Sequence, residues 1–179
     1  MTDMSEKTLR REDKFHGRVV SVHVDEVLLP NGHTSSREVV EHCGGVAVLA
    51  LDADNNVLLV TQYRYVFGRN MLEIPAGKLD PGEDPAVGAL RELREETGAV
   101  PGEFIPLGRI LPSPGCYSEV LHLFLARDLR FEAQALDPDE FLNVDRMPFD
   151  ELLRRCLDGS IEDAKTVTAV LKAKLQLGL

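Results

Sequence analysis

Apolar and polar residues alternate near the start of the chain, in the pattern of half-buried β-strands. The runs RVVSVHVDEVLL and REVVEH are separated by PNGHTS, with Asn31 and Gly32 at the centre of that linker. Two such runs around an Asn-Gly turn predict a β-hairpin. Its valine-rich faces are too small to bury themselves, so we expect this unit to lean on the main domain or on a second subunit. Residues 1–12 are charged, and we expect them to be loose.

A second pair of extended runs follows in GGVAVLALDADNNVLLVTQYRY, with its turn at DADNN. The first limb is almost wholly apolar, which is typical of a strand that is buried on both faces. FIPLGRIL and EVLHLFLARDL predict two further strands.

Helical signals begin at Asp84, a favourable N-cap, followed by Pro85 at the first helical position and ended by Gly98. We therefore expect a helix over Pro85–Thr97. The C-terminal part predicts helices at Phe149–Leu157 and at about residues 162–177. Strands mixed with helices without strict alternation favour an α/β fold with a mixed sheet flanked by helices.

The composition suits a globular chain with a proper core. Its 179 residues are 44% hydrophobic and 28% charged. We expect an N-terminal arm and antiparallel β unit at residues 1–43 and a main domain at residues 44–179. The net charge of −10 argues against binding a nucleic-acid backbone. An acidic protein that acts on an anionic substrate needs cations to bring the two together.

Cys43, Cys116 and Cys156 form no CxxC pair, which favours neither a zinc site nor a disulfide framework. Reduced thiols are typical of the cytoplasm. The N-terminus has no apolar segment of the secretory type, and no apolar run reaches the roughly 18 residues that span a bilayer. We expect a cytoplasmic protein with no membrane partner.

Three glutamates of the predicted helix, Glu92, Glu95 and Glu96, lie at i, i+3 and i+4 and therefore on one face. We expect the apolar residues Val87, Leu90 and Leu93 to dock other faces of the helix on the sheet. Like charges at this spacing destabilise a helix by a few tenths of a kcal/mol each. Arg91 offsets part of the repulsion through Glu95, and a hard cation such as Mg²⁺ or Mn²⁺ would offset much more.

A run of charges on a helix is more often just a solvated face. The surroundings of this run favour the metal site. The stretch IPAG puts an apolar strand end directly before it, Gly77 and Gly82 permit unusual backbone geometry, and Glu83 stands just ahead of the helix. A solvated face needs none of these.

The pattern is Gly77, five residues, Glu83, seven residues, Arg91-Glu92-Leu93, one residue, Glu95-Glu96, one residue and Gly98. It resembles the Nudix box of the Nudix hydrolases, with Ala99 in the place of a bulky aliphatic residue. The resemblance implies an α/β/α sandwich and metal-dependent hydrolysis of a nucleoside diphosphate linked to another group. It also implies that Glu92, Glu96 and the Ala76 carbonyl bind the metal, that Arg91 orients the glutamates and that Glu83 braces the loop.

Residues outside the box are similar to the ADP-ribose and ADP-sugar pyrophosphatase branch of that family. Pro114, in SPGCYSE, lies fifteen positions after Ala99, although a single Pro-Gly is ordinarily just a turn. LPNGHTSSREVVEH, QYRY, LDPDEF and IEDAKT are similar to that branch and occur in its order. The resemblance implies a homodimer that exchanges the N-terminal β unit, so that both subunits contribute to each substrate pocket.

The same resemblance assigns residues to the substrate. Arg37 and Glu38 would contact the adenine side and Arg64 the pyrophosphate, where paired guanidinium donors are useful. Pro114, Gly115 and Glu119 would also line the pocket. Without the family, Arg37 reads as a surface strand residue. The branch often has an aromatic near residues 19–20, where this chain has valine, so base stacking is weaker or comes from Tyr117 or Phe67.

A further carboxylate is needed to position or deprotonate the attacking water. The loop DPDEFLNV offers Asp137, Asp139 and Glu140, and Glu140 matches the family best; the alternative is a solvated loop acid. The resemblance implies hydrolysis of ADP-ribose to AMP and ribose 5-phosphate with Mg²⁺ or Mn²⁺. The alternatives are a hydrolase of GDP-mannose, ADP-glucose or diadenosine compounds, and a non-catalytic Nudix-fold nucleotide sensor.

Overall fold

A computed structural model describes residues 3–136 and 138–178, without the side chain of Leu177. The chain divides into two compact units, of which the first holds residues 1–44 and 111–120 and the second holds residues 45–110 and 121–179. Each unit has its own sheet.

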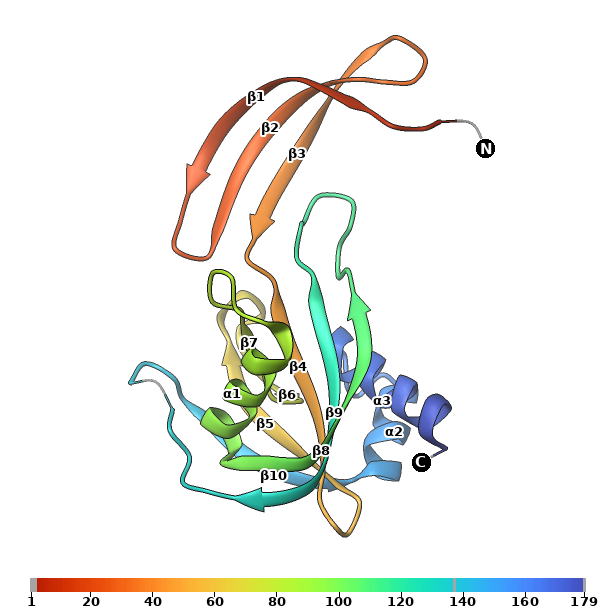
Figure 1. Ribbon diagram of the computed structural model, residues 1–179. Helices are drawn as coiled ribbons and strands as arrows, with labels where there is room; N and C mark the ends of the chain where they lie inside the picture. The colour runs from red at the N-terminus through yellow and green to blue at the C-terminus, as the bar shows by residue number, and fades with distance from the viewer. Residues whose placement is uncertain (1–2, 137, 179) are drawn as a thin grey trace. The chain divides into compact units, whose positions relative to one another are not determined.

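The first unit is a three-stranded antiparallel sheet in the order β1-β2-β3 (Figure 1). Its strands are β1 (Lys7–His16), β2 (Val20–Leu28) and β3 (Thr34–His42). The β2–β3 turn confirms the predicted hairpin: Gly32 has a φ of 84°, and the Leu29 N–H donates to the His33 carbonyl at 2.8 Å. A positive φ is where glycine has no steric penalty.

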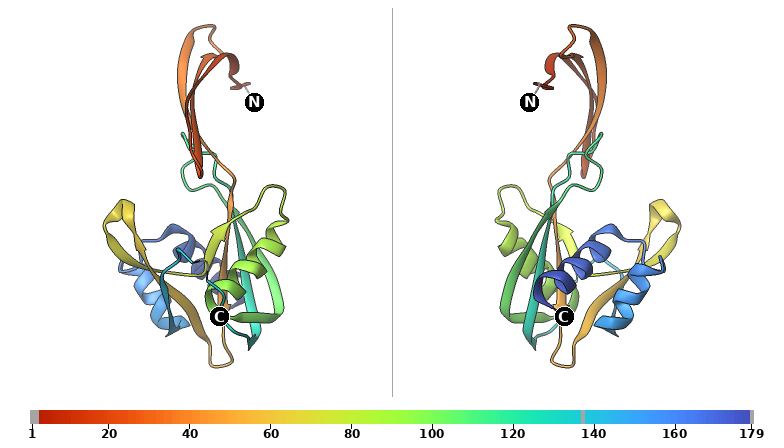
Figure 2. Two further views of the ribbon diagram at one scale, coloured as in Figure 1. Left: turned by 90° about the vertical axis from the view of Figure 1, so that its left-hand side faces the viewer. Right: turned by 90° about the vertical axis from the view of Figure 1, so that its right-hand side faces the viewer.

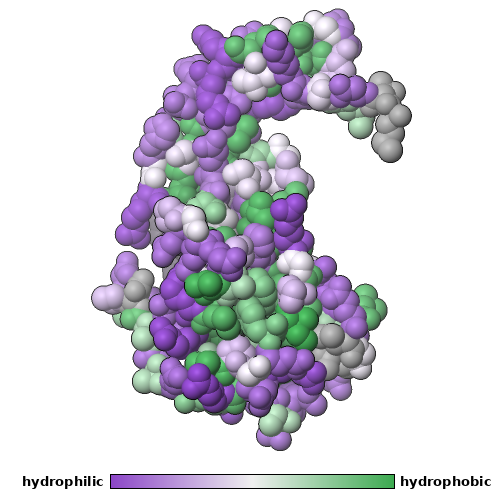
Figure 3. Space-filling model, in the orientation of Figure 1, coloured by the Kyte–Doolittle hydropathy of each residue, from purple (hydrophilic) through white to green (hydrophobic). Residues whose placement is uncertain are grey.

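The expectation that residues 1–12 are loose was wrong for residues 7–12, because β1 begins at Lys7; residues 1–2 lie outside the described residues. Every side chain of β1 is exposed, so no apolar alternation marks it in the sequence. The strand is held by its ladder with β2 and by Arg11, which donates to both carboxylate oxygens of Asp25 at 2.9 and 3.1 Å. Figure 3 shows a mostly hydrophilic surface over this sheet.

Residues 111–120 join the first unit by pairing with the end of β3. The Val40 N–H donates to the Cys116 carbonyl at 2.7 Å, and the Ser118 N–H donates to the Val40 carbonyl at 2.9 Å. The His42 and Tyr117 rings lie 5.5 Å apart, centroid to centroid. This segment therefore extends the N-terminal β unit with residues that lie far away in the sequence.

The second unit is a mixed sheet between two helical layers, in agreement with the predicted α/β/α arrangement (Figures 1 and 2). The sheet order is β10-β5-β4-β9-β8, with β6 paired to β5 and β7 to β4; the β4–β9 pair is parallel. Its elements are β4 (Gly45–Leu51), β5 (Asn56–Arg64), η1 (Tyr65–Phe67), β6 (Arg69–Glu73), β7 (Ala76–Lys78), α1 (Pro85–Thr97), β8 (Ala99–Ile110), β9 (Leu121–Phe131), β10 (Leu142–Pro148), α2 (Phe149–Leu157) and α3 (Ala164–Leu177).

Strand β4 is the centre of this unit, and all seven of its residues are buried, as the apolar run predicted. Successive side chains of a strand point to opposite faces. Val46, Val48 and Ala50 accordingly pack in the cluster under α1. The alternate residues Ala47, Leu49 and Leu51 pack in the larger cluster with α2 and α3. One strand therefore anchors both helical layers.

Helix α1 begins and ends where the sequence predicted. The Asp84 side chain accepts hydrogen bonds from the Ala86 and Val87 N–H groups, at 2.9 and 3.2 Å. Gly98 closes the helix with a φ of 71° and an N–H bond to the Arg94 carbonyl. These caps satisfy polar groups that a helix end leaves unpaired.

The expectation that Val87 and Leu90 dock this helix was wrong for both residues, which are 58% and 38% exposed. The buried face runs through Ala89, Leu93 and Glu96, at the i, i+4 and i+7 spacing of one helical stripe. A glutamate therefore takes a core position that the apolar pattern assigns to leucine or valine. Glu96 is turned into the protein, and the two apolar residues face outward.

Gly98→Ala is predicted to lower the free energy of unfolding by about 2–4 kcal/mol. A Cβ at Gly98 would lie 2.4 Å from the Glu132 carbonyl oxygen, in addition to the strain of a positive φ. Gly159→Ala is the matched control, because φ is 81° there and a Cβ at that position would have no atom within 4 Å. It should lose about 1 kcal/mol from strain alone. Urea unfolding measures both, and equal losses would contradict the prediction.

Candidate active site

The carboxylate of Glu96 lies against the strand that precedes α1. Strand β7 pairs with β4, with Ala76 opposite Ala47, and the Ala76 N–H donates to Glu96 Oε2 at 2.9 Å. Glu96 is only 2% exposed. A buried carboxylate needs hydrogen bonds or a positive charge to compensate for lost water. One backbone N–H is a small part of that compensation.

Gly77 makes room for the second carboxylate, that of Glu92. A Cβ at Gly77 would lie 1.9 Å from the Glu92 carboxyl carbon and about as close to both of its oxygens. Any side chain at Gly77 would therefore displace Glu92. The predicted importance of this glycine has a steric cause: the β7 backbone and the Glu92 carboxylate are in direct contact.

Arg91 binds one glutamate of the loop before α1 and two glutamates of the helix itself. Its Nε and Nη2 donate to the two carboxylate oxygens of Glu83, both at 2.9 Å. Its Nη1 donates to Glu92 at 2.8 Å and to Glu95 at 3.1 Å, and Nη2 also reaches the Lys78 carbonyl. The hydrogen bonds from Arg91 lower the pKa of Glu83 to about 2. The predicted ion pairs of Arg91 are thus present, and they link loop and helix.

Burial makes the negative charge of Glu96 unfavourable. The pKa of Glu96 is raised to about 8, mainly by loss of water and also by the charges of Glu140 and Glu92, while the Ala76 hydrogen bond and the charge of Arg64 act the other way. Burial also raises the pKa of Glu92, against the opposing effect of Arg91. The site therefore concentrates negative charge where water is largely excluded, and a cation would stabilise it.

Glu140 lies near both helical glutamates, since its charge raises the pKa of Glu92 and of Glu96. It is partly buried and precedes β10, in the loop from which a catalytic carboxylate was predicted. Asp139 in the same loop is exposed. Asp137, the third acid of this loop, lies outside the described residues.

Arg64 reaches the same region from the end of β5. Its Nε and Nη2 donate to the two carboxylate oxygens of Glu73, at 2.8 and 2.6 Å. Lys165 of α3 forms a second ion pair with Glu73. The charge of Arg64 acts on Glu96, which places a guanidinium beside the acidic cluster.

Glu73 and Lys165 were not among the predicted site residues. The available signal was a glutamate directly before IPAG, at the end of an otherwise apolar strand. Lys165 lies in IEDAKT, one of the stretches similar to the family branch, but nothing in the sequence indicated its contact with Glu73, 92 positions away.

The other predicted substrate residues belong to the first unit. Arg37 donates to both carboxylate oxygens of Glu6, at 2.9 and 2.5 Å, and Glu38 is exposed. Oε1 of Glu119 lies 3.6 Å from Nδ1 of His42. Pro114 and Gly115 are exposed on the segment that pairs with β3, and Tyr117 is partly buried there. Phe67, the other aromatic considered for base stacking, is in the second unit and 65% exposed.

Two family models match the chain. The model described as the NUDIX domain matches residues 41–170, and the model of the nucleoside diphosphate sugar hydrolase N-terminal domain matches residues 6–40. The chain belongs to the Nudix hydrolase family. The predicted α/β fold and enzyme class are thereby confirmed.

Similar Nudix proteins cover nearly the whole chain. The methanol dehydrogenase activator of Bacillus methanolicus is 46% identical over 97% of this chain and 95% of its own length. The ADP-ribose pyrophosphatase of Bacillus subtilis (strain 168) is 40% identical over 100% of this chain and 98% of its own. A crystal structure of an ADP compounds hydrolase matches with a TM-score of 0.86 at 23% identity, covering 99% of this chain and 97% of that one. This last likeness shows the fold.

The Nudix glutamates fit a hard divalent cation. Carboxylate and carbonyl oxygens are the donors that Mg²⁺ prefers. Within residues 3–136 and 138–178, no three His, Cys, Asp or Glu side chains form a group that could hold a metal by themselves. The predicted set contains only two side chains, those of Glu92 and Glu96, together with the Ala76 carbonyl. Arg91 at present occupies one oxygen of Glu92.

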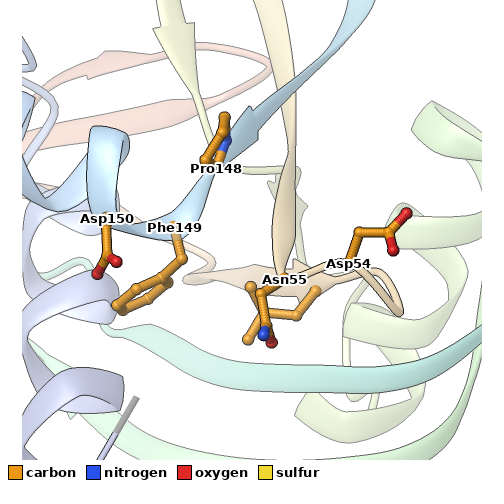
Figure 4. Close-up of a pocket in the computed structure, with 6 residues that line it drawn as sticks. Asp54, Asn55, Pro148, Phe149 and Asp150 are labelled. Carbon is orange, nitrogen blue, oxygen red and sulfur yellow. The ribbon is translucent and has the colours of Figure 1, made fainter.

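A separate pocket of about 300 Å³ lies at the other end of β4 and contains none of the predicted site residues (Figure 4). Its walls come from the β4–β5 turn and the start of α2, and consist of Leu51, Asp54, Asn55, Pro148, Phe149 and Asp150. In the part of the chain that the structure describes, no helix is long and apolar enough to cross a membrane.

Glu96→Gln is predicted to stabilise the metal-free protein at high pH. The pKa of Glu96 is about 8 in the folded protein against an ordinary 4.5, so folding favours the protonated form. Stability of the wild type should therefore fall as pH rises from about 4.5 to 8, and glutamine removes this loss. Thermal melts in EDTA at pH 5 and pH 8.5 measure it.

The melting-temperature advantage of Glu96→Gln should be larger at pH 8.5 than at pH 5. The exposed Glu103→Gln serves as control and should show no such difference. An advantage that does not change with pH would contradict the assignment of a buried, proton-binding Glu96.

Proposed function

We propose that this Nudix hydrolase cleaves the diphosphate of ADP-ribose, with Mg²⁺, to give AMP and ribose 5-phosphate. The proposal rests on one observation: the carboxylates of Glu92, Glu96 and Glu140 lie close together beside Ala76, in a region largely shielded from water. So much negative charge would repel a diphosphate unless a cation lay between them.

Glu92, Glu96 and the Ala76 carbonyl would hold Mg²⁺, with Mn²⁺ as the alternative. When bound, the metal would neutralise charge on the diphosphate and on the phosphate that leaves. Arg91 would keep Glu92 and Glu95 in place, since it ties both to the loop residue Glu83. An arginine held at both ends of its guanidinium has little freedom to move.

The remaining chemistry falls to Arg64 and Glu140. Arg64 would bind phosphate oxygens through its guanidinium, and Glu140 would accept a proton from the attacking water. The water oxygen then forms a bond to one phosphorus as the bond from that phosphorus to the bridging oxygen breaks. The electron pair of the broken bond stays on the leaving phosphate.

The first unit would bind the base. Arg37 and Glu38 would contact the adenine side, with Pro114, Gly115 and Glu119 lining the pocket. This assignment comes from the family resemblance, as does the homodimer with exchanged β units, whereas the cytoplasmic location comes from the cysteine content and the lack of a secretory or membrane-spanning segment in the sequence. All three stay predictions.

We propose ADP-ribose, in place of other nucleotide sugars, because the ADP-ribose pyrophosphatase of Bacillus subtilis aligns over the full length of this chain. A second candidate comes from the Bacillus methanolicus protein, whose name describes activation of a methanol dehydrogenase. If this chain acts in that way, its addition to a methanol dehydrogenase should raise the rate of methanol oxidation.

The chain should hydrolyse ADP-ribose faster than GDP-mannose, ADP-glucose or a diadenosine polyphosphate in a panel assayed with Mg²⁺ and scored by product identity. Glu96→Gln should reduce turnover by about 10²-fold or more, because it removes a metal ligand, while the fold is retained. Faster hydrolysis of another substrate would shift the assignment to that substrate. Near-normal turnover by the variant would exclude the proposed metal site.

Glu140→Gln should lower kcat by about 10²-fold or more while leaving Mg²⁺ and ADP-ribose binding close to wild type, since a general base acts on the water. Glu103→Gln is again a suitable control for a change of charge at the surface. Isothermal titration with Mg²⁺, together with steady-state kinetics, separates the two effects. A variant that binds both ligands and turns over normally would show that another group is the base.

A further inference from the structure

Glu73 is a fully buried carboxylate outside the Nudix box. It ends β6, is 2% exposed, and meets two cationic side chains, those of Arg64 and Lys165. Burial by itself would raise the pKa of Glu73, yet its ion pairs with these two residues outweigh that effect and hold the pKa below its ordinary value. Glu73 is therefore ionised inside the protein, a state that only close cations can stabilise.

Arg64 is fixed by this carboxylate through two of its three nitrogens, Nε and Nη2. The third nitrogen, Nη1, takes no part in the contact with Glu73. The side chain keeps 39% of its surface exposed. In the β5–β6 pair, Arg64 lies opposite Arg69 and Glu73 lies opposite Val60. The Arg64 side chain therefore runs back along the sheet to reach Glu73. A guanidinium held by one edge presents its other edge in a defined direction.

Lys165 completes the arrangement from α3. Its amine also pairs with Asp163 at 2.9 Å, and Asp163 in turn accepts from the Thr166 N–H and hydroxyl at the helix start. Lys165 is only 12% exposed, so it faces Glu73 more than solvent. Lys165 thus gives Glu73 a second positive neighbour beside Arg64, while Asp163 balances the charge of Lys165. The charge of Arg64 acts on Glu96 and lowers its pKa.

We propose that Glu73 is a positioning residue that, together with Lys165, aims Arg64 at the diphosphate of the substrate. This inference rests on the proposed function, because it requires an anionic substrate beside Glu92 and Glu96. Glu73 and Lys165 touch no substrate; they act through the orientation and the charge of Arg64. A merely structural ion pair between β6 and α3 would leave substrate affinity unchanged.

The test compares Glu73→Gln with wild type for ADP-ribose hydrolysis at saturating Mg²⁺. It also compares ADP-ribose binding with Mg²⁺ in the Glu140→Gln background, where turnover is slow. Glutamine keeps the shape but loses the charge-assisted pair, so KM should rise about tenfold or more with kcat changed less than about threefold. The dissociation constant in the Glu140→Gln background should rise in parallel. Unchanged KM and unchanged binding would overturn the inference.

A double-mutant cycle shows whether Glu73 acts through Arg64. Arg64→Lys keeps the charge but loses the two-pronged contact, and in that background Glu73→Gln should add less than about twofold to KM. The same increase in both backgrounds would overturn the inference. Glu162→Gln is the matched control, because its ion pair with Arg69 joins the same segments at an exposed position. KM should not change in this control.

Glu73→Gln removes the buried partner that Arg64 and Lys165 share and could prevent folding. The double variant Glu73→Gln/Lys165→Met removes one charge of each sign and should show the same rise in KM. Normal KM in the folded double variant would overturn the inference while the proposed function stands. Failure of the wild type to bind or hydrolyse ADP-ribose would overturn both.

Discussion

The burial of negative charge at Glu96 is the constraint on which the rest of the site depends. A carboxylate that is 2% exposed cannot be compensated by the single Ala76 N–H that reaches it. Glu92, pressed against Gly77, adds a second charge, and Glu140 adds a third. With all three groups ionised, such a cluster is favourable only with positive charge beside it; without a cation, burial favours the protonated form of Glu96. The fold places that cluster where β7, paired with β4, meets α1.

Positive charge reaches the cluster in two similar arrangements. On one side Arg91 is held by Glu83, and on the other Arg64 is held by Glu73. In each case a carboxylate outside the proposed ligand set grips two guanidinium nitrogens, and part of the arginine remains for the site. Glu83 and Glu73 hold these arginines without being proposed metal ligands, although Arg91 also donates to the proposed ligand Glu92.

The residues proposed for catalysis and those proposed for substrate selection lie in different units of the chain. The proposed metal ligands, general base and phosphate-binding arginine all come from the second unit, which the NUDIX domain model matches. The residues proposed to select the base come from the first unit, whose N-terminal strands match the nucleoside diphosphate sugar hydrolase N-terminal domain. The segment at residues 111–120 pairs with β3 and carries three of those residues. A change of substrate within this family could therefore leave the hydrolytic centre intact.

Local signals in the sequence were sufficient for α1, for β4 and for the spacing of the box glutamates. Caps such as Asp84 and Gly98 act on groups a few residues away, so the chain itself determines where the helix begins and ends. Other features depend on how distant segments pack. All side chains of β1 are exposed, so this strand has no apolar pattern and is held by its ladder with β2 and by the Arg11–Asp25 contact. On α1, Glu96 is buried while Val87 and Leu90 are exposed, which the apolar pattern did not indicate. The Glu73–Lys165 pair joins residues 92 positions apart, and only the tertiary structure brings such charges together.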